Sequence, residues 1–179
     1  MEHTLIKSLF FDTDCISAFL WVKKEWLLHT LYPGRIILPK PVYGEISKVD
    51  HLKAQVDSMN ASKHLTIEEI LVGSAEFEIY NSLAISPTGG QKIIGRGEAA
   101  SIAFAKVRAG IVASNNLKDI SNYIREFNLE HVTTGDILYE ALKKRIITES
   151  QGNMIWSRMI SKRRKLGAHT FSEFLKVYT

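Results

Sequence analysis

Acidic and amide side chains follow several short apolar runs along the 179-residue chain. Asp12 and Asp14 come directly after the first run, and Glu45 lies a few residues beyond the second. Similar polar residues occur in the second half of the chain: Glu98, Ser114, Asn115, Asn116, Asp119 and Asp136. Because the carboxyl ends of parallel strands meet at one edge of a sheet, we expect these side chains to gather there. The sequence therefore predicts a cluster rich in carboxylates.

The chemistry of such a cluster points to a metal ion. Carboxylates brought together repel one another, which raises some of their pKa values unless a cation neutralises them. Oxygen ligands without His or Cys favour Mg²⁺ or Mn²⁺, and the six histidines of the chain show no zinc-ligand spacing. These ions can activate a water for in-line attack at phosphorus and stabilise the leaving oxygen. The residue types therefore indicate phosphodiester hydrolysis.

Alternating strands and helices are the predicted elements that position these residues. Apolar runs at 5–11, 35–38, 63–67, 111–113 and 131–132 have strand character, and the segments between them have helical spacing. We predict that Thr13 or Asp14 caps a first helix, and that a helix from about residue 149 carries the basic run 162–165. The alternation predicts a three-layer α/β/α sandwich with a parallel central sheet.

Composition places limits on the class of protein. With 45% hydrophobic and 23% charged residues, the chain fits a globular domain with a full core. The single cysteine, Cys15, excludes an internal disulfide and favours a reducing compartment, so we expect a cytoplasmic protein. The amino terminus lacks a basic signal-peptide region and no apolar run is long enough to span a bilayer, so we expect neither secretion nor membrane insertion.

Four stretches resemble the PIN-domain ribonucleases, a family that includes toxins of toxin–antitoxin pairs. They are FFDTD at 10–14, PVYGEI at 41–46, GEAASIA at 97–103 and ASNN at 113–116, in the family's order. The resemblance covers about residues 5 to 140 and implies a metal-dependent endoribonuclease. It implies that Asp12, Glu45 and Glu98 surround the metal. It also implies that Ser114 helps to place a phosphate or a water.

The sequence departs from the family pattern at Asn116, where an aspartate is usual. An amide oxygen can ligate a metal but carries no charge, so affinity for a second cation should fall. Asp119, one helical turn further, and Asp136, near the next strand, are both candidates to supply the missing charge. Asp14 is a secondary candidate. Asp14 and Asp136 fit the role of helix N-caps equally well.

The carboxyl-terminal part of the chain is strongly basic. Residues 143–165 carry a net charge of +7, against +4 for the whole chain, which favours a polyanionic partner such as RNA. We predict that RNA phosphates contact Lys162, Arg163, Arg164 and Lys165. We divide the chain into a PIN-like nuclease domain at 1–145 and a basic helical extension at 146–179 that packs on the same domain. The resemblance adds two further partners to test for, an antitoxin protein and a second copy of the chain in a homodimer.

Two other functions are consistent with parts of the sequence. A PIN-like module weakened by Asn116 could bind RNA or a protein without turnover. The stretch 95–100 matches the GxGxxA form of the dinucleotide fingerprint, which makes an NAD-dependent oxidoreductase a remote alternative. The apolar segment before these glycines is only Ile93-Ile94, and Glu98 would place a negative charge against the pyrophosphate. The nuclease is therefore the preferred prediction.

Overall fold

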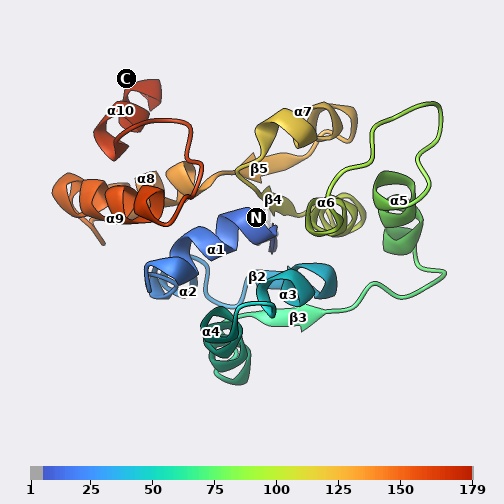
Figure 1. Cartoon of the computed structure of the whole chain (residues 1–179), viewed down its shortest axis with the longest axis horizontal. Coiled ribbons are helices and arrows are strands. Elements are labelled where there is room, and N and C mark those ends of the chain that lie inside the picture. The colour runs from blue at the N-terminus through green and yellow to red at the C-terminus, as the bar shows by residue number, and fades with distance from the viewer. Residues whose placement is uncertain (1–5, 179) are drawn as a thin grey trace, which may run out of the picture.

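The computed structural model describes residues 6–178. Five strands of this part of the chain form one parallel sheet in the order β3-β2-β1-β4-β5 (Figure 1). Their bounds are β1 (Leu9–Phe11), β2 (Ile36–Pro39), β3 (Thr66–Glu68), β4 (Ile111–Ala113) and β5 (Glu130–Val132). Each strand occurs where a run was predicted, although residue 5 of the first run lies outside the described residues.

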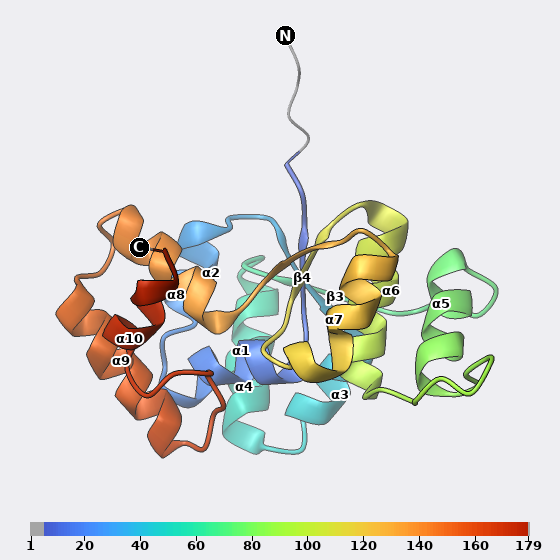
Figure 2. The same ribbon diagram turned by 90° about the horizontal axis from the view of Figure 1, so that it is seen from above.

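Helices connect the strands and cover both faces of the sheet (Figures 1 and 2). They are α1 (Thr13–Trp21), α2 (Trp26–Leu31), α3 (Lys40–Ile46), α4 (Asp50–Ala61), α5 (Ala75–Ala84), α6 (Arg96–Arg108), α7 (Leu117–Glu126), α8 (Thr134–Lys143), α9 (Glu149–Ser161) and α10 (Phe171–Leu175), followed by the 3-10 turn η1 (Lys176–Tyr178). Over residues 6–178, no helix is both long enough and apolar enough to cross a bilayer.

Two hydrophobic cores lie on opposite faces of the sheet, because successive strand side chains point to opposite faces. Leu9 and Phe11 of β1 belong to the core that residues of α1, α4, α8 and α9 complete. Phe10 belongs to the other core, with residues of α6 and α7, and its ring stacks on Phe104 at 5.5 Å between centroids. These layers confirm the predicted α/β/α sandwich.

The order of the strands reverses between β1 and β4. From β1 the chain builds outward through β2 and β3 on one side, then returns to add β4 and β5 on the other. The Asp12 backbone amide donates to the Ala113 carbonyl at 2.9 Å, so the carboxyl ends of β1 and β4 lie side by side. Ligands of parallel α/β sheets bind at such a reversal. Asp12 and Ser114 stand on its two sides.

Two local predictions were wrong. Asp12, and not Thr13 or Asp14, caps α1, because Asp12 keeps an extended backbone while the next two residues are already helical. The basic run 162–165 is not carried by a helix, since α9 ends at Ser161 and Arg163 has a left-handed backbone with φ of 60°. The run therefore lies in the loop between α9 and α10.

Candidate functional site

Asp12 is the buried acid of the site. It lies at the end of β1 with 1% of its surface exposed. Its Oδ1 accepts the Cys15 backbone amide at 2.8 Å, whereas its buried Oδ2 accepts no hydrogen bond of normal geometry from the described chain. Burial raises the pKa of Asp12 to about 7, the Ser114 hydroxyl and the Cys15 amide act in the opposite direction, and the charges of Asp14 and Glu98 add to the rise. Oδ2 thus keeps its lone pairs for an electropositive partner.

Asn116 joins two further acids of the site. Its Nδ2 donates to Glu98 Oε1 at 2.6 Å and to Asp119 Oδ2 at 2.9 Å. Glu98 Oε2 accepts the Gly95 backbone amide at 3.1 Å, which satisfies the N-cap amide at the start of α6. Burial raises the pKa of Glu98, the Asn116 and Gly95 hydrogen bonds oppose this, and the nearby Asp119 charge adds to it. The amide therefore bridges two carboxylates that would otherwise repel each other.

Glu45 reaches the site from α3. The Thr13 hydroxyl donates to Glu45 Oε2, which links α3 to the first turn of α1. A Cβ at Gly97 would lie 2.9 Å from Thr13 Oγ1 and 3.3 Å from Glu45 Oε2. Because glycine has no Cβ, the start of α6 can approach both helices closely. Glu45, Thr13 and the turn before Glu98 therefore meet at one place.

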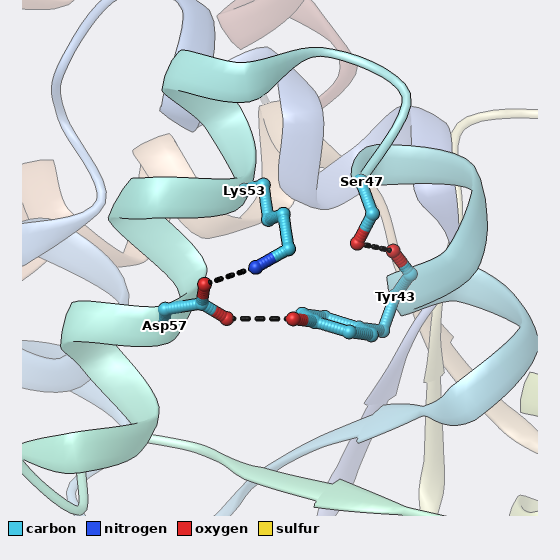
Figure 3. Close-up of polar contacts among 4 residues, drawn as sticks. All are labelled: Tyr43, Ser47, Lys53 and Asp57. Carbon is cyan, nitrogen blue, oxygen red and sulfur yellow. Dashed lines mark hydrogen bonds and ion pairs between the residues drawn. The ribbon is translucent and has the colours of Figure 1, made fainter.

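A polar network holds α3 against α4 (Figure 3). The Tyr43 hydroxyl donates to Asp57 Oδ1 at 2.7 Å, and Lys53 Nζ donates to Asp57 Oδ2 at 2.6 Å. Both contacts lower the pKa of Asp57. The Ser47 hydroxyl donates to the Tyr43 carbonyl at 2.6 Å within the last turn of α3. This network fixes the helix that carries Glu45 two residues after Tyr43.

Of the three acids predicted to surround a metal, Asp12 alone has a buried oxygen without a hydrogen-bond partner within residues 6–178. Among residues 6–178, no three His, Cys, Asp or Glu side chains form a group that could hold a metal ion. Glu45 and Glu98 accept hydrogen bonds from protein donors, while Asp12 Oδ2 has none. A cation there would favour the ionised form of an acid whose pKa is raised. Asp12 is therefore the primary candidate ligand; both oxygens of Glu98 already accept hydrogen bonds, whereas Glu45 accepts one, at Oε2.

The secondary candidates differ in their surroundings. Ser114 is buried, and its Oγ accepts the Asn116 backbone amide at 3.2 Å. Asp14 is exposed in the first turn of α1, close enough to influence Asp12 and Glu98. Asp136 belongs to the capping box of α8: its Oδ2 accepts the Thr133 amide at 2.7 Å, and its Oδ1 accepts the Tyr178 hydroxyl. Both oxygens of Asp136 are thus engaged away from the cluster.

A basic pocket of about 500 Å³ adjoins the acids. Its walls include Asp14, Asn116, Asp119, Arg163, Arg164 and Lys165. Arg164 secures the loop, because its Nη1 donates to Ser17 Oγ of α1 at 3.3 Å and its Nε donates to the Lys162 carbonyl at 3.0 Å. Folding therefore brings three residues of the predicted basic run beside Asn116 and the acids Asp14 and Asp119. Lys162 lies elsewhere, with its Nζ 5.9 Å from the centre of the Trp21 ring.

Two further cations of this pocket were missed by the sequence analysis. Lys92 comes from the segment between α5 and α6, and its Nζ lies 3.7 Å from Asp119 Oδ1. Lys118 comes from the first turn of α7. Lys118 could have been suspected from its position two residues after Asn116. Lys92 had no such signal, because its loop is distant in sequence from every other part of the pocket.

The parallel sheet with helices on both faces, and the acids beside the reversal of strand order, define an α/β/α fold with a polar site at that reversal. A family model described as "DUF3368: PIN domain" matches residues 8–179, and the chain belongs to this PIN-domain family. PIN domains are generally nucleases and typically use divalent metals. No curated protein sequence matches the chain. The family match includes the basic loop and the last helices, beyond the part in which the motifs were recognised.

Proposed function

We propose that the chain is a Mg²⁺- or Mn²⁺-dependent endoribonuclease that hydrolyses phosphodiester bonds of RNA. The observation that carries this proposal is the unpartnered Oδ2 of Asp12, buried where the strand order reverses. Glu98 is close enough to raise the pKa of Asp12, which indicates that the two acids share one electrostatic environment. The basic pocket beside them offers cations for a phosphate backbone.

Each group has a distinct part in this proposal. Asp12, Glu45 and Glu98 would hold the cation, which supplies positive charge to polarise a phosphoryl oxygen and lower the pKa of a water. Ser114 and Asn116 orient the phosphate or the water through their hydroxyl and amide groups. Asp119 is held in place by Asn116 and supplies a further negative charge. Arg163, Arg164 and Lys165 bind phosphates on the side of the basic pocket.

A cleavage assay tests the activity directly. Protein freed of metal with a chelator is supplied with Mn²⁺ and a labelled single-stranded RNA, and the products are resolved on a gel. We expect the parent to cleave internally, and Asp12→Asn to lose cleavage because it removes the buried charge that faces the cation. Asp50→Asn, an exposed acid at the start of α4, is the matched control and should cleave like the parent. Equal cleavage by Asp12→Asn and the parent would remove the proposed site.

A second candidate function is RNA binding without turnover. It is favoured by the Asn116 amide, which already bridges Glu98 and Asp119, and by the lack of a three-ligand metal group in residues 6–178. The same assay separates the two functions when binding is measured in parallel. Tight RNA binding with no cleavage in either Mn²⁺ or Mg²⁺ would favour the binding module.

The proposal extends to the cell. The motifs that resemble toxins of toxin–antitoxin pairs support a role as a toxin that acts on cytoplasmic RNA, held in check by an antitoxin protein. Induced expression of the parent should then arrest bacterial growth, whereas expression of Asp12→Asn to the same level should not. Growth arrest by both proteins would show that any toxicity does not depend on cleavage.

A further inference from the structure

A second pocket, here termed the α3–α5 pocket, lies on another side of Glu45. It has a volume of about 700 Å³, and its walls include Glu45, Lys48, Phe77, Tyr80 and Arg96. Glu45 belongs both to this pocket and, through Thr13, to the acid cluster. A ligand that extends beyond the acids on this side would therefore enter the α3–α5 pocket.

The pocket combines aromatic rings with cations. Phe77 and Tyr80 are three residues apart on α5, so they share one face of that helix. Both are partly buried, and neither ring contacts another aromatic ring within residues 6–178. Lys48 and Arg96 are exposed and form no ion pair with an acid in that same part of the chain. Tyr80 also packs against the core that contains Phe10, so the parts of both rings that line the pocket, together with the two cations, are available to a ligand.

This combination fits a nucleotide better than a phosphate alone. Proteins that bind single-stranded nucleic acid stack bases on aromatic side chains and hold the backbone with nearby cations. A site for phosphate alone would need the cations but not the rings. The basic pocket beside Asn116 and Asp119 already supplies a phosphate-binding surface that has cations and no aromatic ring among its lining residues.

We propose that the α3–α5 pocket is a nucleobase subsite. One unpaired base of an RNA strand stacks on Phe77 and Tyr80, and the adjoining phosphate lies at Lys48 and Arg96. The RNA then passes Glu45 and the other acids of the site, Asp12 and Glu98, and continues toward the basic pocket. This inference rests on the proposed function in so far as RNA is the ligand, and it adds a part of the protein that recognises the base.

A binding experiment in EDTA tests the subsite, because no cleavage occurs without metal. Fluorescence anisotropy compares a labelled single-stranded RNA with a ribose-phosphate strand of the same length that lacks bases. We expect the parent to bind the RNA about tenfold more tightly than the baseless strand, the size of effect that stacking on aromatic side chains produces. Tyr80→Leu and Phe77→Leu should lose most of this preference, since leucine keeps apolar volume but has no aromatic face.

Two controls separate stacking from loss of structure. Tyr80→Phe retains the ring and should keep the preference. Trp26→Leu removes an exposed aromatic residue that has a lysine nearby, as the rings of the pocket do, but that belongs to α2, which lies well apart from α5 (Figures 1 and 2). It should also keep the preference. Thermal melts of all variants confirm that each is folded.

The outcomes distinguish this inference from the proposed function. Equal affinity of the parent for both strands, or an unchanged preference in both leucine variants, would overturn the nucleobase subsite even if the protein cleaves RNA in Mn²⁺. Conversely, a base preference that depends on Phe77 and Tyr80 would establish the subsite even if no cleavage is found.

Discussion

Asp12 uses its two carboxylate oxygens differently. Oδ1 caps α1 through the Cys15 amide, which fixes the orientation of the side chain. Oδ2 is left buried and without a hydrogen bond of normal geometry from the described chain, a state that costs free energy unless a cation or a proton is present. The cap therefore does more than begin a helix, because it holds the carboxylate with its second oxygen left for a cation or a proton.

Asp12 should make the stability of the metal-free protein fall as the pH rises. Its pKa is raised from 3.8 to about 7, so folding favours the protonated acid. This contribution is complete below the pKa of the unfolded chain and is lost as the pH rises through the folded value. Between pH 5 and pH 8, the free energy of unfolding should fall by about 2–3 kcal/mol more in the parent than in Asp12→Asn, which cannot ionise. Urea denaturation in EDTA measures the difference, and parallel pH profiles would contradict it.

Asn116→Asp should lower the stability of the metal-free protein and raise its affinity for a divalent cation. Without metal, the variant loses the amide that bridges Glu98 and Asp119 and adds a third negative charge. We expect the free energy of unfolding in EDTA to fall by about 1–3 kcal/mol, as when hydrogen bonds to charged groups are removed. Titration calorimetry with Mn²⁺ should show tighter binding than in the parent, because the site gains a charged ligand. Unchanged affinity would mean that this position does not face the cation.

Several short elements, rather than one, place the site residues. Asp12 follows β1, Glu45 is on α3, Glu98 is in the first turn of α6, and Asn116 precedes α7. The N-termini of α1 and α6 add partial positive charge, which favours anionic groups at this edge of the sheet. The hydrogen bond from Tyr43 to Asp57 holds α3 against α4. The geometry around Glu45 therefore depends on a helix that contributes no site residue.

The loop after α9 should contribute to RNA affinity through its charge. Arg163 and Arg164 line the basic pocket, and each phosphate contact to a single strand contributes about 0.7 to the slope of log affinity against log salt. The double variant Arg163→Ala/Arg164→Ala should therefore bind RNA more weakly and with a flatter salt dependence. Lys143→Ala/Lys144→Ala removes the same charge at the end of α8, outside that pocket, and should leave the slope unchanged. Equal slopes in the parent and the arginine variant would assign the loop a structural role.

The carboxyl-terminal helices share the main core of the molecule. Trp156 of α9 is fully buried in the same core as Leu9 and Phe11. Its ring lies 5.8 Å from that of Phe171 and 5.3 Å from that of Phe174, and its Nε1 donates to the Ala168 carbonyl at 3.1 Å. We propose that residues 146–179 are an extension in sequence only and are required for the core to form.

Substitution of Trp156 tests this dependence. Trp156→Ala should lower the free energy of unfolding by about 3–5 kcal/mol, the usual cost of removing a buried aromatic side chain. Val72→Ala, at a position that is 83% exposed, should change it by no more than about 0.5 kcal/mol. Chemical denaturation followed by circular dichroism measures both. A chain that ends at residue 145 should fail to unfold cooperatively, and cooperative unfolding of that fragment would show that 1–145 is an independent domain.

Much of the fold could be predicted from the sequence because it depends on local patterns. Each predicted apolar run overlaps an observed strand, and the Ala-rich stretch 97–107 forms most of α6. The errors occurred where a single backbone conformation decides the outcome. Asp12 rather than its neighbours caps α1, and the left-handed Arg163 marks the turn that separates the basic run from α9. Residue types at these positions do not distinguish the alternatives.

The amino-acid sequence by itself determined the alternation of strands and helices along the chain, the family motifs and the acids at the strand ends, since each is a property of neighbouring residues. Only the tertiary structure decided which of those acids share one environment. Asn116 bridges Glu98 and Asp119, Asp136 turns away to cap α8, and the loop at 163–165 lies beside Asn116. These outcomes depend on contacts between segments far apart in the chain, which periodicity and spacing do not encode.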